Sequence, residues 1–181
     1  ALGLKGEIIT TPFSYVATTS SIVWEGCIPV FVDILPEKFT IDPNKIRSKI
    51  SNKTKAIIPV HLYGQSCEME QIMKIAKKYN IYVIEDNAQS QLAKHNDQYT
   101  GSFGDINATS FYPTKNLGAI GEAGAITTNN IELARFAIQY RNYGSEIKYV
   151  NNIKGVNSRL DEIQAAILNV KIKYLKKITT E

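Results

Sequence analysis

Short apolar runs alternate along this chain with longer segments in which apolar residues recur at helical spacing. Runs rich in isoleucine and valine are typical of strands that are buried on both faces of a parallel sheet. In segment 68–79, Met69, Ile72 and Ala76 share one face, which predicts an amphipathic helix. Strands are expected at residues 7–10, 29–34, 55–60, 81–84, 108–111 and 124–127, and helices at 15–26, 43–50, 68–79, 131–140 and 158–176.

This order of elements predicts an α/β fold with three layers, α/β/α, built around a mostly parallel sheet. Asp42 followed by Pro43 is typical of an N-cap and a first helical residue. No internal repeat or linker divides the 181 residues, whose length suits one domain. Ligands of such sheets bind beyond the carboxyl ends of the strands. The turn at 12–15, the segment 85–86 and the segment 110–115 are therefore the places where a site is expected.

Composition narrows the possible function without identifying it. The chain is 44% hydrophobic and 21% charged, as in an ordinary globular protein. Its net charge of +4 is spread along the sequence, and the densest lysine cluster, at 171–177, fits an exposed helix face better than a nucleic-acid site. No apolar run approaches the roughly 20 residues of a membrane span, and no signal-peptide pattern is present. We therefore expect a cytoplasmic protein without nucleic-acid or membrane partners.

The cysteines and histidines do not suggest a disulfide framework or a metal site. Cys27 and Cys67 lie far apart, and neither His61 nor His95 belongs to a cluster with ligand spacing. Two reduced cysteines and no bound metal are expected.

Two side chains at the ends of expected strands could carry chemistry. Lys115 follows a buried strand among apolar and small residues, where an amine can act as a nucleophile, although most loop lysines are solvated. Asp86 ends an apolar strand, where a carboxylate needs a cationic partner or a structural role such as an N-cap or ion pair. Gly118, Gly121 and Gly124 match neither the dinucleotide nor the Walker pattern, and turns explain them.

Seven segments form an ordered series of motifs: 11–18, 29–34, 59–64, 84–89, 101–105, 110–118 and 155–162. In sequence and order they resemble the DegT/DnrJ/EryC1/StrS aminotransferases, which are fold-type I enzymes that use pyridoxal phosphate (PLP) to aminate nucleotide-linked keto sugars. The resemblance covers nearly the whole chain but only about the middle half of a full-length member. It implies that residues 1–181 are part of the large PLP-binding domain. The upstream phosphate loop and the C-terminal small domain of the family lie outside this sequence, so we expect weak or no turnover from these residues alone.

The resemblance implies catalytic roles for two residues and cofactor contacts for others. Lys115 corresponds to the lysine that binds PLP covalently, and it would also move the proton during transamination. Asp86 corresponds to the acid that pairs with the pyridine nitrogen. Gln89 matches the position that contacts the phenolic oxygen of the ring.

Three further positions complete the implied cofactor site. Tyr15 falls where an aromatic ring stacks on PLP, and Ser110 matches a phosphate-binding hydroxyl. Asn157 matches an amide that reaches the phosphate in the neighbouring subunit, which implies a homodimer. Tyr15 could instead be a core residue, and Asn157 could instead cap a helix that begins at Ser158.

The sequence also departs from the family pattern next to the expected site. Asn87 stands where alanine is common, and Gln91-Leu92 stands where His-Gly is typical. The segment 112–118 is more similar to that of members acting on a 3-keto sugar. The function implied is therefore transamination of a nucleotide-linked keto sugar, 3-keto and 6-deoxy, with L-glutamate as the amino donor.

Other functions remain open on the sequence alone. A sugar 3-dehydratase of the same fold would carry histidine at the position of Lys115, so the lysine argues against it. A nucleotide-sugar binding module without chemistry would leave Lys115 and Asp86 unexplained. The chain could also be a non-catalytic remnant that still dimerises through helix 158–176. That helix carries an apolar stripe that either meets a partner or packs within one subunit, formed by Leu160, Ile163, Ile167, Val170 and Tyr174.

Overall fold

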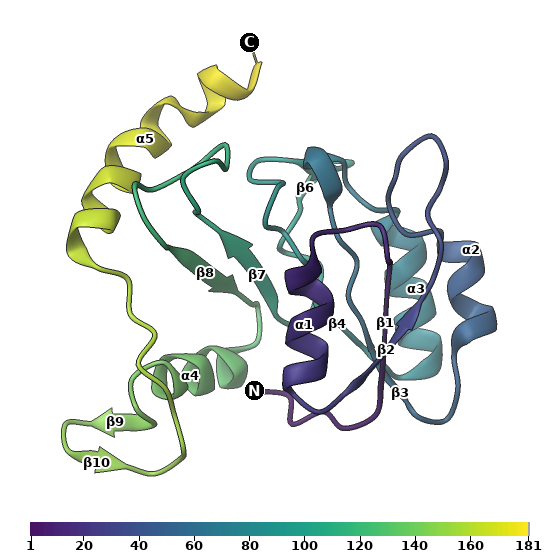
Figure 1. Ribbon diagram of the computed structural model, residues 1–181, viewed down its shortest axis with the longest axis horizontal. Coiled ribbons are helices and arrows are strands. Elements are labelled where there is room, and N and C mark those ends of the chain that lie inside the picture. Colours follow the sequence, from purple (N-terminus) through teal and green to yellow (C-terminus); the bar gives the residue numbers. More distant parts are fainter. Residues whose placement is uncertain (181) are drawn as a thin grey trace.

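The computed structural model describes residues 1–180 and has a parallel sheet at its centre (Figure 1). Four parallel strands lie in the order β2-β1-β3-β4. Parallel bridges join Asp86 to Val60 and to Ala108, so β7 continues the sheet beyond β4, and β8 pairs antiparallel with β7. These strands are β1 (Glu7–Thr10), β2 (Ile28–Phe31), β3 (Thr54–Ile57), β4 (Tyr82–Val83), β7 (Asn107–Ser110) and β8 (Gly124–Thr127). The predicted α/β class with a mostly parallel sheet is confirmed.

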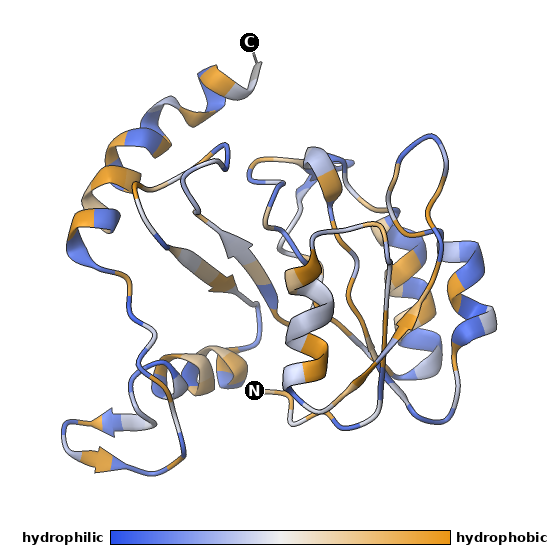
Figure 2. Ribbon diagram, viewed as in Figure 1, coloured by the Kyte–Doolittle hydropathy of each residue, from blue (hydrophilic) through white to orange (hydrophobic). Residues whose placement is uncertain are grey.

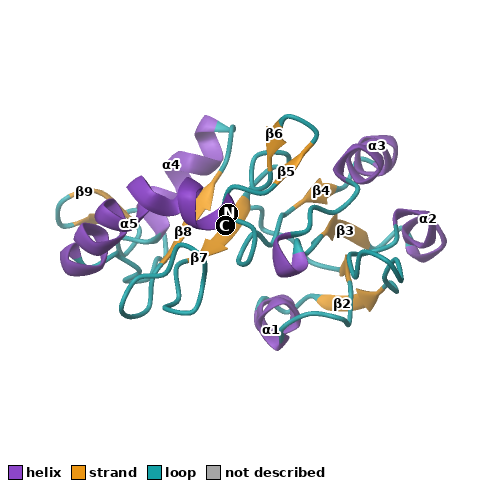
Figure 3. Ribbon diagram, turned by 90° about the horizontal axis from the view of Figure 1, so that it is seen from above, coloured by secondary structure: helices purple, strands orange, loops and turns teal. Residues whose placement is uncertain are grey.

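Helices connect the parallel strands, as the alternating pattern predicts (Figure 3). The connecting helices are α1 (Val16–Trp24), α2 (Pro43–Ile46) and α3 (Met69–Tyr79), with 3-10 turns η1 (Arg47–Lys49) and η2 (Leu62–Gly64). Two further helices, α4 (Ile131–Tyr140) and α5 (Glu162–Thr180), follow β8. Two small hairpins not expected from the sequence are β5–β6 (Lys94–His95, Gln98–Tyr99) and β9–β10 (Ser145–Ile147, Val150–Asn151).

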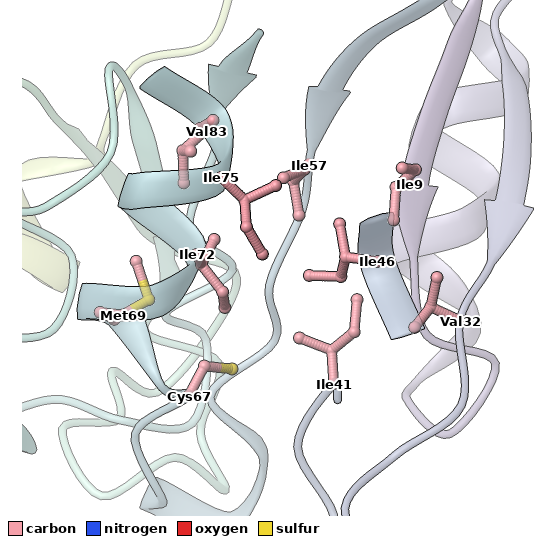
Figure 4. Close-up of a cluster of buried hydrophobic side chains, with 11 residues drawn as sticks. Ile9, Val32, Ile41, Ile46, Ile57, Cys67, Met69, Ile72, Ile75 and Val83 are labelled. Atoms are coloured by element: carbon pink, nitrogen blue, oxygen red, sulfur yellow. The ribbon is translucent and has the colours of Figure 1, made fainter. Parts of the chain in front are cut away.

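Both faces of the sheet are covered, because neighbouring residues of a strand point to opposite sides. Ile8 belongs to a cluster with Ile22 of α1, whereas Ile9 belongs to the larger cluster formed with α2 and α3. Figure 4 shows that the side chains of this larger cluster lie between the sheet and the helices α2 and α3. Its members are Ile9, Val32, Ile41, Ile46, Ile57, Cys67, Met69, Ile72, Ile75, Ala76 and Val83.

Two apolar segments are less buried than their hydrophobic character suggests. The run 29–34 is not a buried strand: β2 lies at the edge of the sheet, and Ile28 and Phe31 are exposed. In α1 the inward residues are Thr18 and Ile22, whereas Trp24 is 85% exposed. An edge strand and an outer helix face lack neighbours within the described chain, so their hydrophobic character alone does not predict burial.

Local cap chemistry agrees with the sequence. The Asp42 side chain accepts a hydrogen bond from Asn44 N at 2.9 Å, and Pro43 is the first residue of α2. Cys27 and Cys67 are both free and buried. Within residues 1–180, no helix combines the length and the hydrophobicity needed to cross a bilayer.

Candidate active site

Polar side chains gather where the parallel strands end, and hydrogen bonds join the segments that carry them. Thr18 of α1 reaches Asp86 beyond β4, and Tyr63 of η2 reaches Gln89. Gln91 then reaches the main chain of Ser110 at the end of β7. The site expected at this edge of the sheet is therefore a connected group of residues rather than separate loops.

Asp86 is held from several sides. Its Oδ2 accepts a hydrogen bond from Thr18 Oγ1 at 2.7 Å, and its Oδ1 accepts one from Ala88 N at 3.2 Å. Its main chain is also paired, since Asp86 N donates to Pro59 O and Asp86 O accepts from His61 N. The half-buried carboxylate is thus fixed in direction by two hydrogen-bond donors.

Glu85, next to Asp86, is completely buried and accepts four hydrogen bonds. Its Oε1 accepts from Phe103 N and Gly104 N, both at 2.7 Å. Its Oε2 accepts from His61 Nε2 at 2.9 Å and from Gly101 N at 2.7 Å. Burial alone raises the pKa of Glu85, but the hydrogen bonds from His61, Gly104 and Gly101 outweigh it and hold the pKa below its usual value.

The His61 ring is fixed by a second contact. Cys67 N donates to His61 Nδ1 at 3.1 Å, so Nδ1 is an acceptor. Nε2 therefore carries the hydrogen and donates the hydrogen bond to Glu85 Oε2. Burial raises the pKa of the Cys67 thiol far above its usual value, which makes this cysteine unreactive. The pair of His61 and Glu85 therefore supports the loop and strand around Asp86 from inside the core.

Sequence reasoning missed this buried support. The signal available was the pair Glu85-Asp86 at a strand end, because alternation places neighbouring acids on opposite faces. Glycines in the 101–104 turn were a second signal. Gly101 has a φ of +78°, and a Cβ at Gly104 would lie 2.7 Å from Val83 O. The turn therefore presents its N–H groups to the buried carboxylate only with glycine at these positions.

Gln89 joins the segments after β3 and β4. Its Oε1 accepts a hydrogen bond from Tyr63 N at 2.8 Å; Tyr63 belongs to η2, after β3, and Gln89 to the loop after β4. Tyr63 has a φ of 56°, so the main chain turns sharply where it donates this hydrogen bond. The Gln89 amide is thereby oriented with its nitrogen directed away from Tyr63.

Ser110 is the last residue of β7, and Lys115 lies on the turn that follows it. Ser110 Oγ accepts from Tyr112 N at 3.2 Å, and Lys115 N donates to Tyr112 O at 2.9 Å. Lys115 is half-buried, and within residues 1–180 its ammonium group forms no hydrogen bond or ion pair. The turn requires glycine at its end, because a Cβ at Gly118 would lie 2.4 Å from Pro113 O.

The remaining two predicted residues are placed differently. Tyr15 immediately precedes α1 and is 73% exposed, so the interpretation of Tyr15 as a core residue is wrong. Asn157 forms a bridge with Asn142, just after α4, and its Oδ1 accepts from Arg159 Nε. In the described part of the chain, no hydrogen bond joins Asn157 to the other predicted site residues. The helix that it was alternatively expected to cap begins at Glu162, so that capping role is wrong too.

Comparison with known proteins gives consistent matches. The dTDP-3-amino-3,6-dideoxy-alpha-D-galactopyranose transaminase of Aneurinibacillus thermoaerophilus is 55% identical over 174 residues, which are 96% of this chain and 48% of that protein. The UDP-2-acetamido-2-deoxy-3-oxo-D-glucuronate aminotransferase of Pseudomonas aeruginosa is 43% identical over 175 residues, 97% of this chain and 49% of that protein. The chain spans about half the length of the curated relatives it matches.

Solved structures are similar over the same extent. Streptomyces venezuelae DesV has a TM-score of 0.92 at 38% identity, covering 95% of this chain and 46% of that one. The ntda protein of Bacillus subtilis, solved with its bound cofactor PMP, has a TM-score of 0.91 at 41% identity, covering 97% of this chain and 41% of that one. A model of the DegT/DnrJ/EryC1/StrS aminotransferase family matches residues 1–181, and the chain belongs to this family of PLP-dependent sugar aminotransferases.

Proposed function

We propose that the protein carrying this chain transfers an amino group from L-glutamate to a nucleotide-linked keto sugar, 3-keto and 6-deoxy, with PLP as cofactor. The observation that carries the proposal is the Asp86 carboxylate, fixed by Thr18 and Ala88 at a strand end and linked through its loop to Gln89 and Ser110. The name of the Aneurinibacillus relative, a transaminase for a 3-amino-3,6-dideoxy sugar, supports this choice of substrate.

The residues present fit PLP. Each Asp86 oxygen accepts one side-chain or main-chain donor and keeps lone pairs for a pyridinium N–H. Gln89 uses its Oε1 for Tyr63, which leaves the amide nitrogen to donate to the phenolic oxygen. Ser110 Oγ accepts from Tyr112 N, so its own proton is available for a phosphate oxygen. A carboxylate, an amide and a hydroxyl thus offer the charges and donors that the three polar parts of PLP need.

Each residue then has a defined task. When bound, PLP supplies an electron sink for the negative charge that develops on the substrate carbon. Lys115 is the residue that would hold the cofactor covalently through Nζ, and its free amine would take the proton from the α-carbon of L-glutamate. Asp86 keeps the ring nitrogen protonated by pairing with its positive charge. Tyr15 offers an exposed aromatic face on which the ring can stack.

A homodimer is part of the proposal. In α5 the buried contacts are made by Leu168 and Leu175, which pack with Leu117 and Ala119. The predicted stripe is divided: Leu160 packs against this cluster and Ile167 is half-buried, whereas Ile163 is 62% exposed, and Val170 and Tyr174 are also exposed.

Figure 2 shows hydrophobic residues recurring along α5, which extends away from the sheet. Packing within residues 1–180 leaves Ile163, Val170 and Tyr174 exposed, and a second subunit would bury them. In such a dimer Asn157 would serve the site of the neighbouring subunit.

The proposed function is tested by the absorbance spectrum of the purified protein with PLP, before and after borohydride. The wild type should show a cofactor band that borohydride fixes to the chain, and Lys115→Ala should show none. Lys154→Ala, which removes an exposed lysine, is the matched control and should behave as wild type. A folded wild type without the band would contradict the proposal and favour the non-catalytic remnant.

With the band established, amino transfer from L-glutamate is measured against nucleotide-linked 3-keto and 4-keto sugars. Conversion of a 4-keto sugar alone would contradict the proposed keto position. Failure with L-glutamate, together with conversion from another amino acid, would contradict the proposed donor. These assays separate the cofactor assignment from the substrate assignment.

A further inference from the structure

Gln91 connects the three segments that carry the proposed cofactor residues. It follows Asp86 and Gln89 on the loop beyond β4, and it is only 8% exposed. Its Nε2 donates to Ser110 O at 2.7 Å and to Thr109 Oγ1 at 2.9 Å. Its own main-chain oxygen accepts from Asn116 Nδ2 at 2.9 Å, directly beside Lys115.

The orientation of the Gln91 amide follows from its neighbours. Thr109 Oγ1 donates to Asn87 O at 3.0 Å, so toward Gln91 it acts as an acceptor. Ser110 O and Ala88 O can only accept. Turning the amide over would place its oxygen against these acceptors, so the nitrogen must face them.

This orientation leaves the other end of the amide without a partner. Among residues 1–180, Gln91 Oε1 is one of two buried side-chain polar atoms that have no hydrogen bond, the other being Thr40 Oγ1. Burying an unpaired carbonyl is unfavourable. The side chain is therefore held by the contacts of its nitrogen, and these contacts end on Ser110 and Thr109 at the site.

We propose that Gln91 is a positioning residue, which holds the strand end of Ser110 and the turn of Lys115 in register with Asp86. This inference rests on the proposed function, in which those three residues bind PLP. Gln91 would touch neither cofactor nor substrate. The side-chain amide of Gln91 would position Ser110, and the main-chain carbonyl of Gln91 would position Asn116, next to Lys115.

The first test measures PLP affinity by absorbance titration in the full-length protein. Gln91→Met keeps the length of the side chain but removes the donor, and we expect about a tenfold rise in the PLP dissociation constant. Gln91→His restores one N–H and should recover part of that loss. Asn116→Asp, which cannot donate to Gln91 O, should also weaken binding.

A stability control separates positioning from general destabilisation. Ile72→Val removes a buried methyl group in the core on the α3 side of the sheet and lowers stability without touching the site. It should leave the PLP dissociation constant unchanged. A Gln91→Met constant within twofold of wild type, or an equal weakening by Ile72→Val, would overturn the proposal.

A second readout does not depend on PLP. Amide hydrogen exchange in the cofactor-free protein reports on the turn through Tyr112 N, which donates to Ser110 Oγ, and Lys115 N, which donates to Tyr112 O. Gln91→Met should speed exchange at both amides about tenfold, with α3 unaffected. Unchanged exchange would overturn the positioning role. If the wild type binds no PLP, the proposed function fails, while exchange still decides whether Gln91 holds this turn.

Discussion

Replacing Glu85 by glutamine tests whether the buried carboxylate supports the strand end of Asp86. Glutamine has nearly the same shape, and its carbonyl oxygen can keep the hydrogen bonds from Phe103 and Gly104. Its NH2 group, however, would face two donors, Gly101 N and His61 Nε2. The imidazole cannot reverse its donor and acceptor, because its Nδ1 already accepts from the main chain at Cys67.

The size of the effect follows from these contacts. Two hydrogen bonds to a charged acceptor are lost, each contributing roughly 1.5–3 kcal/mol. Removing the buried charge offsets part of this loss, because burying an ion costs several kcal/mol. We therefore expect Glu85→Gln to reduce the free energy of unfolding by about 3 kcal/mol, a large part of the roughly 5–15 kcal/mol of a typical domain. A chain of this length should then melt about 6–12 °C lower.

Acid dependence gives a second check on Glu85. Its pKa is below the usual value in the folded protein, so the unfolded chain takes up a proton at higher pH than the folded one. The stabilisation from Glu85 is complete at neutral pH and is lost as the pH falls below about 4.5 toward the lowered folded pKa. The difference in unfolding free energy between wild type and Glu85→Gln should therefore shrink in acid.

Chemical denaturation of the wild type and of Glu85→Gln across roughly pH 3–8 measures the free energy of unfolding and its change with pH. Glu70→Gln is the matched control, since Glu70 forms an exposed pair with Lys74, and its melting temperature should stay close to wild type. A Glu85→Gln protein within about 0.5 kcal/mol of wild type at neutral pH would refute the reasoning, because that is the scale of an ordinary surface substitution.

Two further substitutions test the strand end and its loop. Thr18→Val keeps the shape but removes the donor to Asp86 Oδ2, and we expect about tenfold weaker PLP binding in an absorbance titration; an unchanged dissociation constant would contradict the role of Thr18. Leu92 has a φ of +70° and is 40% exposed, so Leu92→Gly should raise the free energy of unfolding by about 0.5–1 kcal/mol in denaturant titrations. Leu92→Ala keeps the Cβ and should show no gain, and a glycine variant no more stable than the alanine variant would contradict the strain argument.

Much of the secondary structure could be predicted from local pattern. Helix 131–140 has the predicted bounds and begins after Asn130, whose side chain accepts from Glu132 N and Leu133 N. The strands at 7–10 and 124–127 also have the predicted bounds. Helical spacing, strand runs and cap residues act over a few neighbouring residues, so one sequence suffices to detect them. The start of α5 was misplaced by four residues, at Ser158 instead of Glu162, because Asn157, Ser158 and Asp161 are all residue types that favour an N-cap and the sequence does not single out one of them.

The candidate site also has a part that was predicted from the sequence and a part that was not. Lys115, Asp86, Gln89 and Ser110 were selected from motifs and strand ends, and the structure connects the loops that hold them; their roles stay predictions. What holds those loops was decided only by tertiary structure. Glu85 is hydrogen-bonded to His61 and Gly101, which lie 24 and 16 residues away in the sequence. Gln91 is hydrogen-bonded to Ser110, which lies 19 residues away.

The sequence by itself thus determined which segments are strands or helices, and which residue types lie at strand ends. Only the folded chain decided which buried polar atoms find partners and which apolar faces stay exposed, as on α1 and α5. The physical reason is that secondary structure follows from local geometry. Burial and hydrogen-bond pairing depend instead on contacts between residues far apart in the chain, and a hydrophobic or polar pattern contains no record of those partners.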